Sequence, residues 1–483
     1  MASTMAWAHK IFDGQWRTGG GGTLDVVAPA TAEVIATVGA ADVGDFDRAV
    51  AKAVSAQREW AAKPYTERAS VMTAAAALLA ADPERLSRWL VPESGSSQGK
   101  AGGEVQLVAA ELAEAANLAS QPYGQVLRSA KSRFSVGRYV PVGVVGVISP
   151  FNFPALLSMR SVAPALAVGN AVVLKPDPRT PISGGLALAE LFAEAGLPEG
   201  LLHVLPSGAD VGAALVAHPD VPCISFTGST SAGRRIGEAA APLLKKVHLE
   251  LGGNNAFLVL PDADISAAAS AGAWGSFLHQ GQICMASGRH LIPEHLAEEY
   301  IGKLAEIATR ITVGDPSDPS NALGPIIDEN QLKRVDGIVQ ATLTAGADLA
   351  AGGTYEDLYY RPTVLGNVPK DSPAFTEEIF GPVAPVTTYR TVDEAIDIVN
   401  SSEFGLSVSI LTANPFKAFE LADRIRSGAV HINDQTVDDE AVAPFGGVKS
   451  SGSGGHFGST VNLDTFCDLQ WVTMQSDIEK YPF

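Results

Sequence analysis

The sequence predicts an α/β protein in which parallel strands and helices alternate along much of the chain. Short apolar segments at residues 171–175, 200–205 and 223–226 fit strands, and helical patterns at 183–195 and 232–241 separate them. Strands separated by helices indicate βαβ units, whose parallel strands share one sheet. The length of 483 residues exceeds one ordinary domain, so we expect about two or three domains.

The N-terminal part carries helical patterns ahead of this region. Apolar stripes at helical spacing occupy residues 45–60, 67–79 and 103–118. The polar, glycine-rich segment 94–103 precedes the last stripe and predicts a loop.

β-branched residues mark further strands. Residues 134–149 are rich in valine and interrupted by glycines, and 247–251 and 256–260 are also strand candidates. A second alternating region follows, with a helical pattern at 297–311. The apolar candidate 467–474 has no helix after it, so we expect this strand to pair with another element or another subunit.

Charge and cysteine content exclude several classes of protein. The net charge of −19 argues against nucleic-acid or anionic-membrane partners. Three cysteines fit a reducing compartment without disulfides.

No basic region leads into a long apolar run, and no segment reaches ~18 uninterrupted apolar residues, so we expect a cytoplasmic protein without a membrane span. The nine histidines form no ligand pair at helical spacing, so no metal site is expected.

A cysteine, a glutamate and an asparagine lie in glycine- or proline-rich contexts that suit reactive groups. Cys284 lies in Gln-Gly-Gln-Ile-Cys-Met-Ala, Glu250 precedes Leu-Gly-Gly, and Asn152 lies in Ser-Pro-Phe-Asn-Phe-Pro. A thiolate adds to a carbonyl carbon, an amide N–H stabilises the resulting oxyanion, and a carboxylate activates water. Each residue alone also fits an ordinary structural role. Cys223 and Cys467 fit core positions.

A phosphate-binding turn is indicated at residues 226–233. No Gly-x-Gly-x-x-Gly fingerprint follows a strand, but Phe-Thr-Gly-Ser-Thr-Ser-Ala-Gly leads from a strand into a helical pattern. Glycine allows close backbone approach there, and a helix N-terminus favours phosphate. Lys175 ends a strand and precedes a proline-rich turn, where ligands bind in parallel sheets.

Together these segments resemble the aldehyde dehydrogenase superfamily over essentially the whole chain. Glu250 and Cys284 lie 34 residues apart, a spacing typical of that family. The resemblance implies that Cys284 is the nucleophile, Glu250 the general base, and Asn152 an oxyanion donor beside the Cys284 backbone N–H.

The same resemblance implies a nicotinamide cofactor, NADP or NAD. It assigns to cofactor binding Phe151, Lys175, Gly228, Ser229, Gly233, Glu378 and Phe380. Members that prefer NAD often carry a glutamate three residues after the lysine, where this chain has Pro178. Loss of that carboxylate removes its repulsion of a 2′-phosphate, and Arg179 offers a partner for one. We therefore expect NADP to be accepted, alongside NAD.

The resemblance also implies three parts and a homodimer or homotetramer. We expect a Rossmann-like cofactor domain at 1–120 and 140–253 and an α/β catalytic domain at 254–458. A small β oligomerisation arm is expected at 121–139 and 459–483.

The substrate signal lies in residues 431–440, 277–282 and 470–474, which resemble benzaldehyde and vanillin dehydrogenases. An aromatic ring needs an apolar slot. Candidate lining residues are Leu156, Leu157, Leu278, Ile283, Met285 and Phe445.

Arg160 leaves an alternative open. In semialdehyde dehydrogenases an arginine at this position grips a substrate carboxylate, although an acidic neighbour would equally explain it. Acyl transfer to coenzyme A, a cysteine hydrolase without redox chemistry and a non-catalytic scaffold are the further alternatives.

Overall fold

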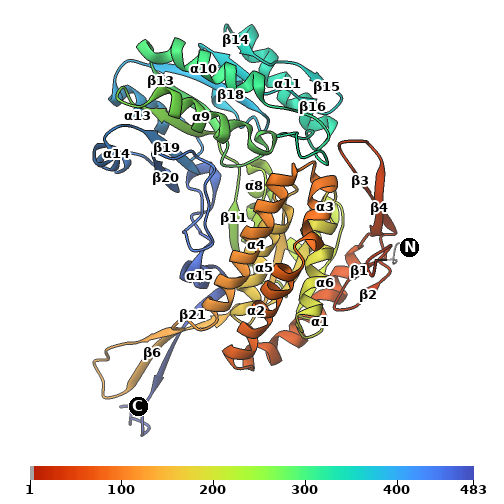
Figure 1. The fold of residues 1–483 in the computed structure, drawn as a ribbon. Coiled ribbons are helices and arrows are strands. Elements are labelled where there is room, and N and C mark those ends of the chain that lie inside the picture. Colours follow the sequence, from red (N-terminus) through yellow and green to blue (C-terminus); the bar gives the residue numbers. More distant parts are fainter. Residues whose placement is uncertain (1–4) are drawn as a thin grey trace.

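The computed structural model describes residues 5–483, which form two large sheets with their helices and a projecting three-stranded arm (Figure 1). The first sheet has the strand order β11-β10-β7-β8-β9-β1-β2. The five strands from the edge strand β11 to β9 are parallel, as the alternating pattern predicted, and β1 and β2 extend the sheet as antiparallel strands. Its strands are β1 (Ile11–Phe12), β2 (Trp16–Arg17), β7 (Val144–Ile148), β8 (Ala171–Lys175), β9 (Leu202–Val204), β10 (Cys223–Thr227) and β11 (Lys246–Glu250).

The second sheet has the order β14-β17-β18-β13-β12-β19-β20 and is parallel except at β14. Its strands are β12 (Asn255–Val259), β13 (Ser287–Pro293), β14 (Asp348–Ala351), β17 (Thr363–Gly366), β18 (Val383–Tyr389), β19 (Ser407–Leu411) and β20 (Ala429–Ile432). Glu250 ends the last strand of the first sheet, and Cys284 precedes β13 of the second. The two candidate catalytic residues therefore come from different sheets.

Helices cover both sheets. Those of the first half are α1 (Val43–Ala62), α2 (Tyr65–Ala81), α3 (Glu84–Ser94), α4 (Gln98–Leu118), α5 (Pro154–Ala167), α6 (Ala187–Glu194), α7 (Ala209–Ala217) and α8 (Thr230–Ala240). Those of the second half are α9 (Ile265–Phe277), α10 (Ala297–Arg310), α11 (Glu329–Thr344), α12 (Pro373–Thr376), α13 (Val392–Ser401), α14 (Pro415–Ala422) and α15 (Asn462–Phe466). Two hairpins, β3 (Thr23–Val27) with β4 (Val34–Gly39) and β15 (Tyr355–Glu356) with β16 (Tyr359–Tyr360), complete the fold.

The loop predicted at 94–103 is wrong over most of its length. Gly95 takes a left-handed φ of 66° and ends α3, and the Ser97 side chain caps α4 by accepting from the Lys100 backbone N–H. Helix continues through three glycines because α4 packs against α2 and α5, and tertiary packing overrides low helix propensity.

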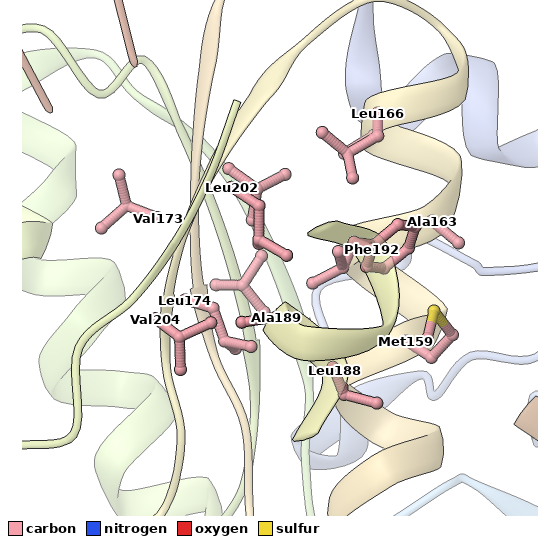
Figure 2. Packing of buried hydrophobic residues seen from close by; sticks show 14 of the residues in the cluster. Met159, Ala163, Leu166, Val173, Leu174, Leu188, Ala189, Phe192, Leu202 and Val204 are labelled. Carbon is pink, nitrogen blue, oxygen red and sulfur yellow. The ribbon is translucent and has the colours of Figure 1, made fainter. Parts of the chain in front are cut away.

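Helix α5 is buried along its whole length and fixes the loop before it. Figure 2 shows Met159, Ala163 and Leu166 of this helix packed with side chains from β8, α6 and β9. Their buried partners are Val173, Leu174, Leu188, Ala189, Phe192, Leu202 and Val204. Because α5 cannot shift without opening this core, the segment 149–153 that leads into it has a defined position.

The arm forms as an antiparallel sheet of β21 (Cys467–Met474), β6 (Phe134–Pro141) and β5 (Gly124–Val126). The predicted terminal strand therefore pairs with another element of its own chain. In Figure 1 the arm extends away from both large sheets. Among residues 5–483 no helix combines the length and apolarity that crossing a membrane requires.

Candidate active site

A cleft of about 670 Å³ opens at the carboxyl ends of β7, β8 and β10. Ligands bind at this edge of parallel sheets. The cleft brings together ten of the residues singled out from the sequence, namely Phe151, Asn152, Leu157, Lys175, Arg179, Gly228, Ser229, Cys284, Glu378 and Phe380.

The Cys284 loop follows three consecutive left-handed residues. His279, Gln280 and Gly281 have φ of 49°, 56° and 64°. Left-handed non-glycine residues carry strain of ~1–3 kcal/mol each, so neighbours must hold them. The Gln280 amide does so by donating to the carbonyl of Gly95 at 2.9 Å. At Gly281 a Cβ would lie 2.1 Å from the Gly381 carbonyl oxygen, so only glycine fits.

An asparagine of the second sheet fixes the backbone of Cys284. Asn255 Nδ2 donates to the carbonyls of Cys284 at 2.8 Å and Ala286 at 2.9 Å. Gly253 allows this close approach, because a Cβ there would lie 2.5 Å from the Cys284 oxygen. The loop therefore presents the partly exposed Cys284 side chain to the cleft.

Asn152 reaches the same loop from the first half. Its Nδ2 donates to the carbonyl of Gln282 at 2.9 Å. The backbone of Asn152 is held in turn by Lys100, whose Nζ donates to its carbonyl at 2.7 Å. The amide predicted to stabilise an oxyanion thus lies next to the nucleophile loop.

A buried ion pair supports the Asn152 segment. Lys100 pairs with Glu104, and Glu104 Oε1 accepts from the backbone N–H groups of Ala155 and Leu156. Helix α5 begins with Pro154 and has no side-chain cap of its own, so Glu104 serves that purpose. Sequence patterns did not reveal this pair, because Lys100 lies in the segment predicted as a loop.

Burial and two nearby carboxylates favour the protonated form of the Cys284 thiol. Burial, followed by the nearby carboxylates of Glu378 and Glu250, raises the pKa of Cys284 to about 12. Burial also raises the pKa of Glu378 to about 7. The Gly253 N–H, which donates to this carboxylate at 2.9 Å, opposes that rise. The resting thiol is therefore protonated at neutral pH.

Glu250 lies beside the cleft rather than in its wall. Its Oε2 accepts from the Gly447 N–H at 3.3 Å, and its Oε1 lies 3.1 Å from His248 Nε2. Burial raises the pKa of Glu250, and His248 opposes that rise. The carboxylate is thus turned toward the C-terminal segment in this conformation.

The other end of the cleft suits a dinucleotide phosphate. Ser229 caps α8 by accepting from the Ala232 N–H, and Gly228, Ser229 and Thr230 line the cleft at this helix N-terminus. Gly233 does not line it. A Cβ on Gly233 would lie 2.4 Å from Leu251 Cδ2, so this glycine serves packing of α8 against the sheet.

Arg179 is already engaged by carboxylates. Its Nε and Nη2 donate to Asp177 at 2.9 and 2.8 Å, and its Nη1 donates to Asp328 at 2.7 Å. The guanidinium also stacks 4.1 Å from the centroid of the Phe151 ring. Phe151 in turn meets Phe380 edge to face at 5.9 Å, so the predicted aromatic residues form one wall.

Apolar side chains pack beside Cys284. Ile283 and Met285 are buried there and pack with Leu278, Phe445 and other apolar side chains. Leu156, also expected in this slot, packs into the main core instead, whereas Leu157 lines the cleft. Of the six side chains predicted to line a substrate slot, only Leu157 lines this cleft, and the apolar cluster beside the thiol is closely packed.

Arg160 is buried between two acids. Its Nε donates to Glu111 at 3.1 Å, its Nη2 pairs with Asp439, and its guanidinium lies 4.7 Å from the centroid of the Phe445 ring. These contacts match the expectation of an arginine held by acidic neighbours. A substrate carboxylate would have to displace one of them.

Several cleft residues were not anticipated from the sequence. Arg334 and Gln331 of α11 donate to the carbonyls of Glu378 and Phe380 and hold that turn. His248 was also missed, although its place two residues before Glu250 on a strand puts both side chains on one face.

The chain matches the model of the aldehyde dehydrogenase family over residues 16–472. It is 54% identical to a vanillin dehydrogenase of Amycolatopsis sp., across 99% of this chain and 98% of that protein. It is 48% identical to a benzaldehyde dehydrogenase [NAD(+)] of Pseudomonas putida, across 99% and 98%. The crystal structure of succinate-semialdehyde dehydrogenase from Burkholderia pseudomallei superposes with a TM-score of 0.95 at 32% identity, covering 98% of this chain and 99% of that one.

Alkylation should report the raised pKa of Cys284. We expect its rate with iodoacetamide to rise about tenfold per pH unit from pH 7 to 10 without a plateau, because only the thiolate reacts. Glu378→Gln should increase the rate at pH 8, since it removes one carboxylate that raises the pKa. Mass spectrometry of Cys284→Ala controls for the buried Cys223 and Cys467. A plateau below pH 9 would contradict the assignment.

Proposed function

Since this chain belongs to the aldehyde dehydrogenase family, we propose that it oxidises aromatic aldehydes of the benzaldehyde and vanillin type to carboxylic acids. The observation that carries the proposal is the position of Cys284, which packs against an apolar cluster and lines a cleft that reaches the N-terminus of α8. The names of the two similar relatives support the aromatic substrate class.

The chemistry follows from the residues around Cys284. Its sulfur loses a proton and bonds to the aldehyde carbon, giving a thiohemiacetal whose oxyanion is stabilised by Asn152 Nδ2 and the Cys284 backbone N–H. A nicotinamide cofactor, held by Lys175, Gly228 and Ser229 when bound, would accept the hydride that the thiohemiacetal carbon loses as its C–O bond becomes a carbonyl. A thioester on Cys284 remains, and water attacks it while Glu250 takes the proton. The acid leaves and the thiol is restored.

The alternatives have less support. Hydrolysis is favoured over acyl transfer to coenzyme A because Glu250 lies within electrostatic reach of Cys284. A cysteine hydrolase would have no use for the phosphate-binding turn at α8. A carboxylated semialdehyde is disfavoured because Glu111 and Asp439 already engage Arg160.

We propose that the enzyme accepts NADP as well as NAD. Pro178 places no carboxylate at the position where a glutamate would repel a 2′-phosphate, and Arg179 lines the cleft beside it. The pairs of Arg179 with Asp177 and Asp328 offset its charge, which favours dual use over strict preference for NADP.

We also propose that the arm joins subunits into a homodimer or homotetramer in the cytoplasm. Apolar side chains are exposed along it, namely Val126, Leu127, Phe134, Leu469, Trp471 and Met474. Such a row of exposed apolar residues marks an interaction surface. The free state of all three cysteines is in keeping with a reducing compartment.

Initial rates test the substrate class. We expect reduced-cofactor formation with benzaldehyde and vanillin, and rates at least about a hundredfold lower with succinic semialdehyde. Cys284→Ala should abolish turnover, because no other thiol lines the cleft. Turnover of the semialdehyde alone would identify Arg160 as a carboxylate clamp and overturn the aromatic assignment.

Arg179→Gln tests the cofactor proposal. Loss of the cation leaves Asp177 and Asp328 to repel a 2′-phosphate, so KM for NADP should rise about tenfold while KM for NAD changes little. Arg390→Gln is the matched control, since Arg390 is exposed and pairs with Glu294 on the second half. Equal rises in both KM values would remove Arg179 from 2′-phosphate recognition.

Leu469→Glu tests the arm. Leu469 is 70% exposed, and a charge there should lower the mass measured by light scattering toward that of a monomer. Phe416→Glu on α14 should leave the mass unchanged, although Phe416 is 86% exposed. A wild-type protein that is already monomeric would refute the proposal.

A further inference from the structure

His248 is a buried titratable residue that the reaction as described above does not use. It lies two positions before Glu250 on β11, so both side chains project from one face of the strand. His248 Nε2 lies 3.1 Å from Glu250 Oε1, and each side chain is only 3% exposed. The contact does not reach hydrogen-bond geometry, and within residues 5–483 neither of these two atoms has a hydrogen-bond partner. Each side chain therefore brings an unsatisfied polar atom to the other.

The C-terminal segment 445–457 keeps both side chains in place. The Phe457 ring meets the imidazole edge to face with centroids 4.2 Å apart. Gly455 leaves no spare room, because a Cβ there would lie 2.5 Å from His248 Cδ2. The same segment donates the Gly447 N–H to Glu250. The imidazole therefore cannot rotate away without disturbing this segment.

This arrangement holds the Glu250 carboxylate away from the cleft wall in which Cys284 lies. To take a proton from water at a Cys284 thioester, the carboxylate has to turn and later return. His248 and Arg160 lower the pKa of Glu250. The pKa of Cys284 is raised by Glu378 and Glu250 and lowered by Arg160. Of these groups only His248 touches Glu250.

Resting on the aldehyde oxidation proposed above, we propose that His248 is a positioning residue for the general base. Its Nε2–H donates to the Glu250 carboxylate while that carboxylate is turned toward the C-terminal segment, and this bond keeps the carboxylate ionised. After each hydrolysis the carboxylate returns to His248. His248 itself does not contact the reacting atoms.

The direction of the pH effect follows from the contacts. Burial raises the pKa of Glu250, and His248 is the largest of the influences that lower it. Without His248 the pKa of Glu250 rises further, so a higher pH is needed to ionise the base. The acid limb of the kcat profile therefore moves toward higher pH.

Four variants test the proposal: His248→Phe, His248→Gln, Glu250→Gln and the double variant His248→Phe/Glu250→Gln. We expect His248→Phe to lower kcat at pH 7 about tenfold and to shift the acid limb up by about one pH unit. The rapid first turnover of reduced-cofactor formation should keep its rate, since it precedes hydrolysis. His248→Gln should regain most of kcat, because its amide also donates. In the Glu250→Gln background, His248→Phe should have no further effect.

His203→Gln is the matched control, because His203 is an equally buried histidine on β9 of the same sheet. It should leave the pH profile unchanged. A slowed first turnover in His248→Phe, or an additional loss in the double variant, would assign His248 a structural role and overturn the proposal.

A readout without turnover separates this inference from the proposed function. Infrared difference spectra of wild type against Glu250→Gln follow ionisation of the Glu250 carboxyl in the enzyme without substrate. We expect the His248→Phe carboxyl to stay protonated to a higher pH than that of the wild type. If no aldehyde is oxidised, the proposed function fails. An unshifted infrared titration refutes only the positioning role of His248 and leaves the proposed function standing.

Discussion

The hydrogen bond from the Asn152 amide to the Gln282 carbonyl joins the two halves of the site. Asn152 belongs to the segment before α5, which the main core and the buried Lys100–Glu104 pair hold in place. Gln282 belongs to the nucleophile loop, and its own side chain accepts from the Ile327 N–H at 3.0 Å. Because both partners are anchored in separate sheets, this bond sets the position of the thiol relative to the oxyanion donor.

Burial and nearby carboxylates keep the Cys284 thiol protonated in the resting site. Burial and the carboxylates of Glu378 and Glu250 raise the pKa of Cys284, whereas Arg160 lowers it. A protonated thiol is a poor nucleophile and is also protected from oxidation. Lowering the pKa of Cys284 requires a change in the hydration or the charge of the cleft, such as the movement of a carboxylate.

The C-terminal segment 445–457 contacts both the apolar cluster beside Cys284 and the pair of Glu250 and His248. Phe445 packs in the apolar group around Cys284, and Gly447 and Phe457 contact Glu250 and His248. Arg160 stacks over Phe445 and Phe457 while its acids hold it. A substitution in this segment is therefore expected to alter substrate fit and hydrolysis together, because the same backbone supports both.

Local patterns were enough to predict the alternating sheet and the strand 467–474, and they singled out Cys284 and Asn152, which the structure places along one cleft. These features depend on side-chain periodicity and on turn residues, which neighbours in the chain determine. The helix at 98–103 could not be predicted in this way, because its glycines have low helix propensity and packing against α5 decides its structure. The sequence likewise could not show that Gly233 packs closely against Leu251. Nor could it show which acids engage Arg160 and Arg179. Whether an arginine is free to bind a ligand depends in part on acids far away in the chain, Glu111 and Asp439 for Arg160 and Asp328 for Arg179. Only the folded structure brings these charges together, whereas Asp177 lies two residues from Arg179 in the sequence.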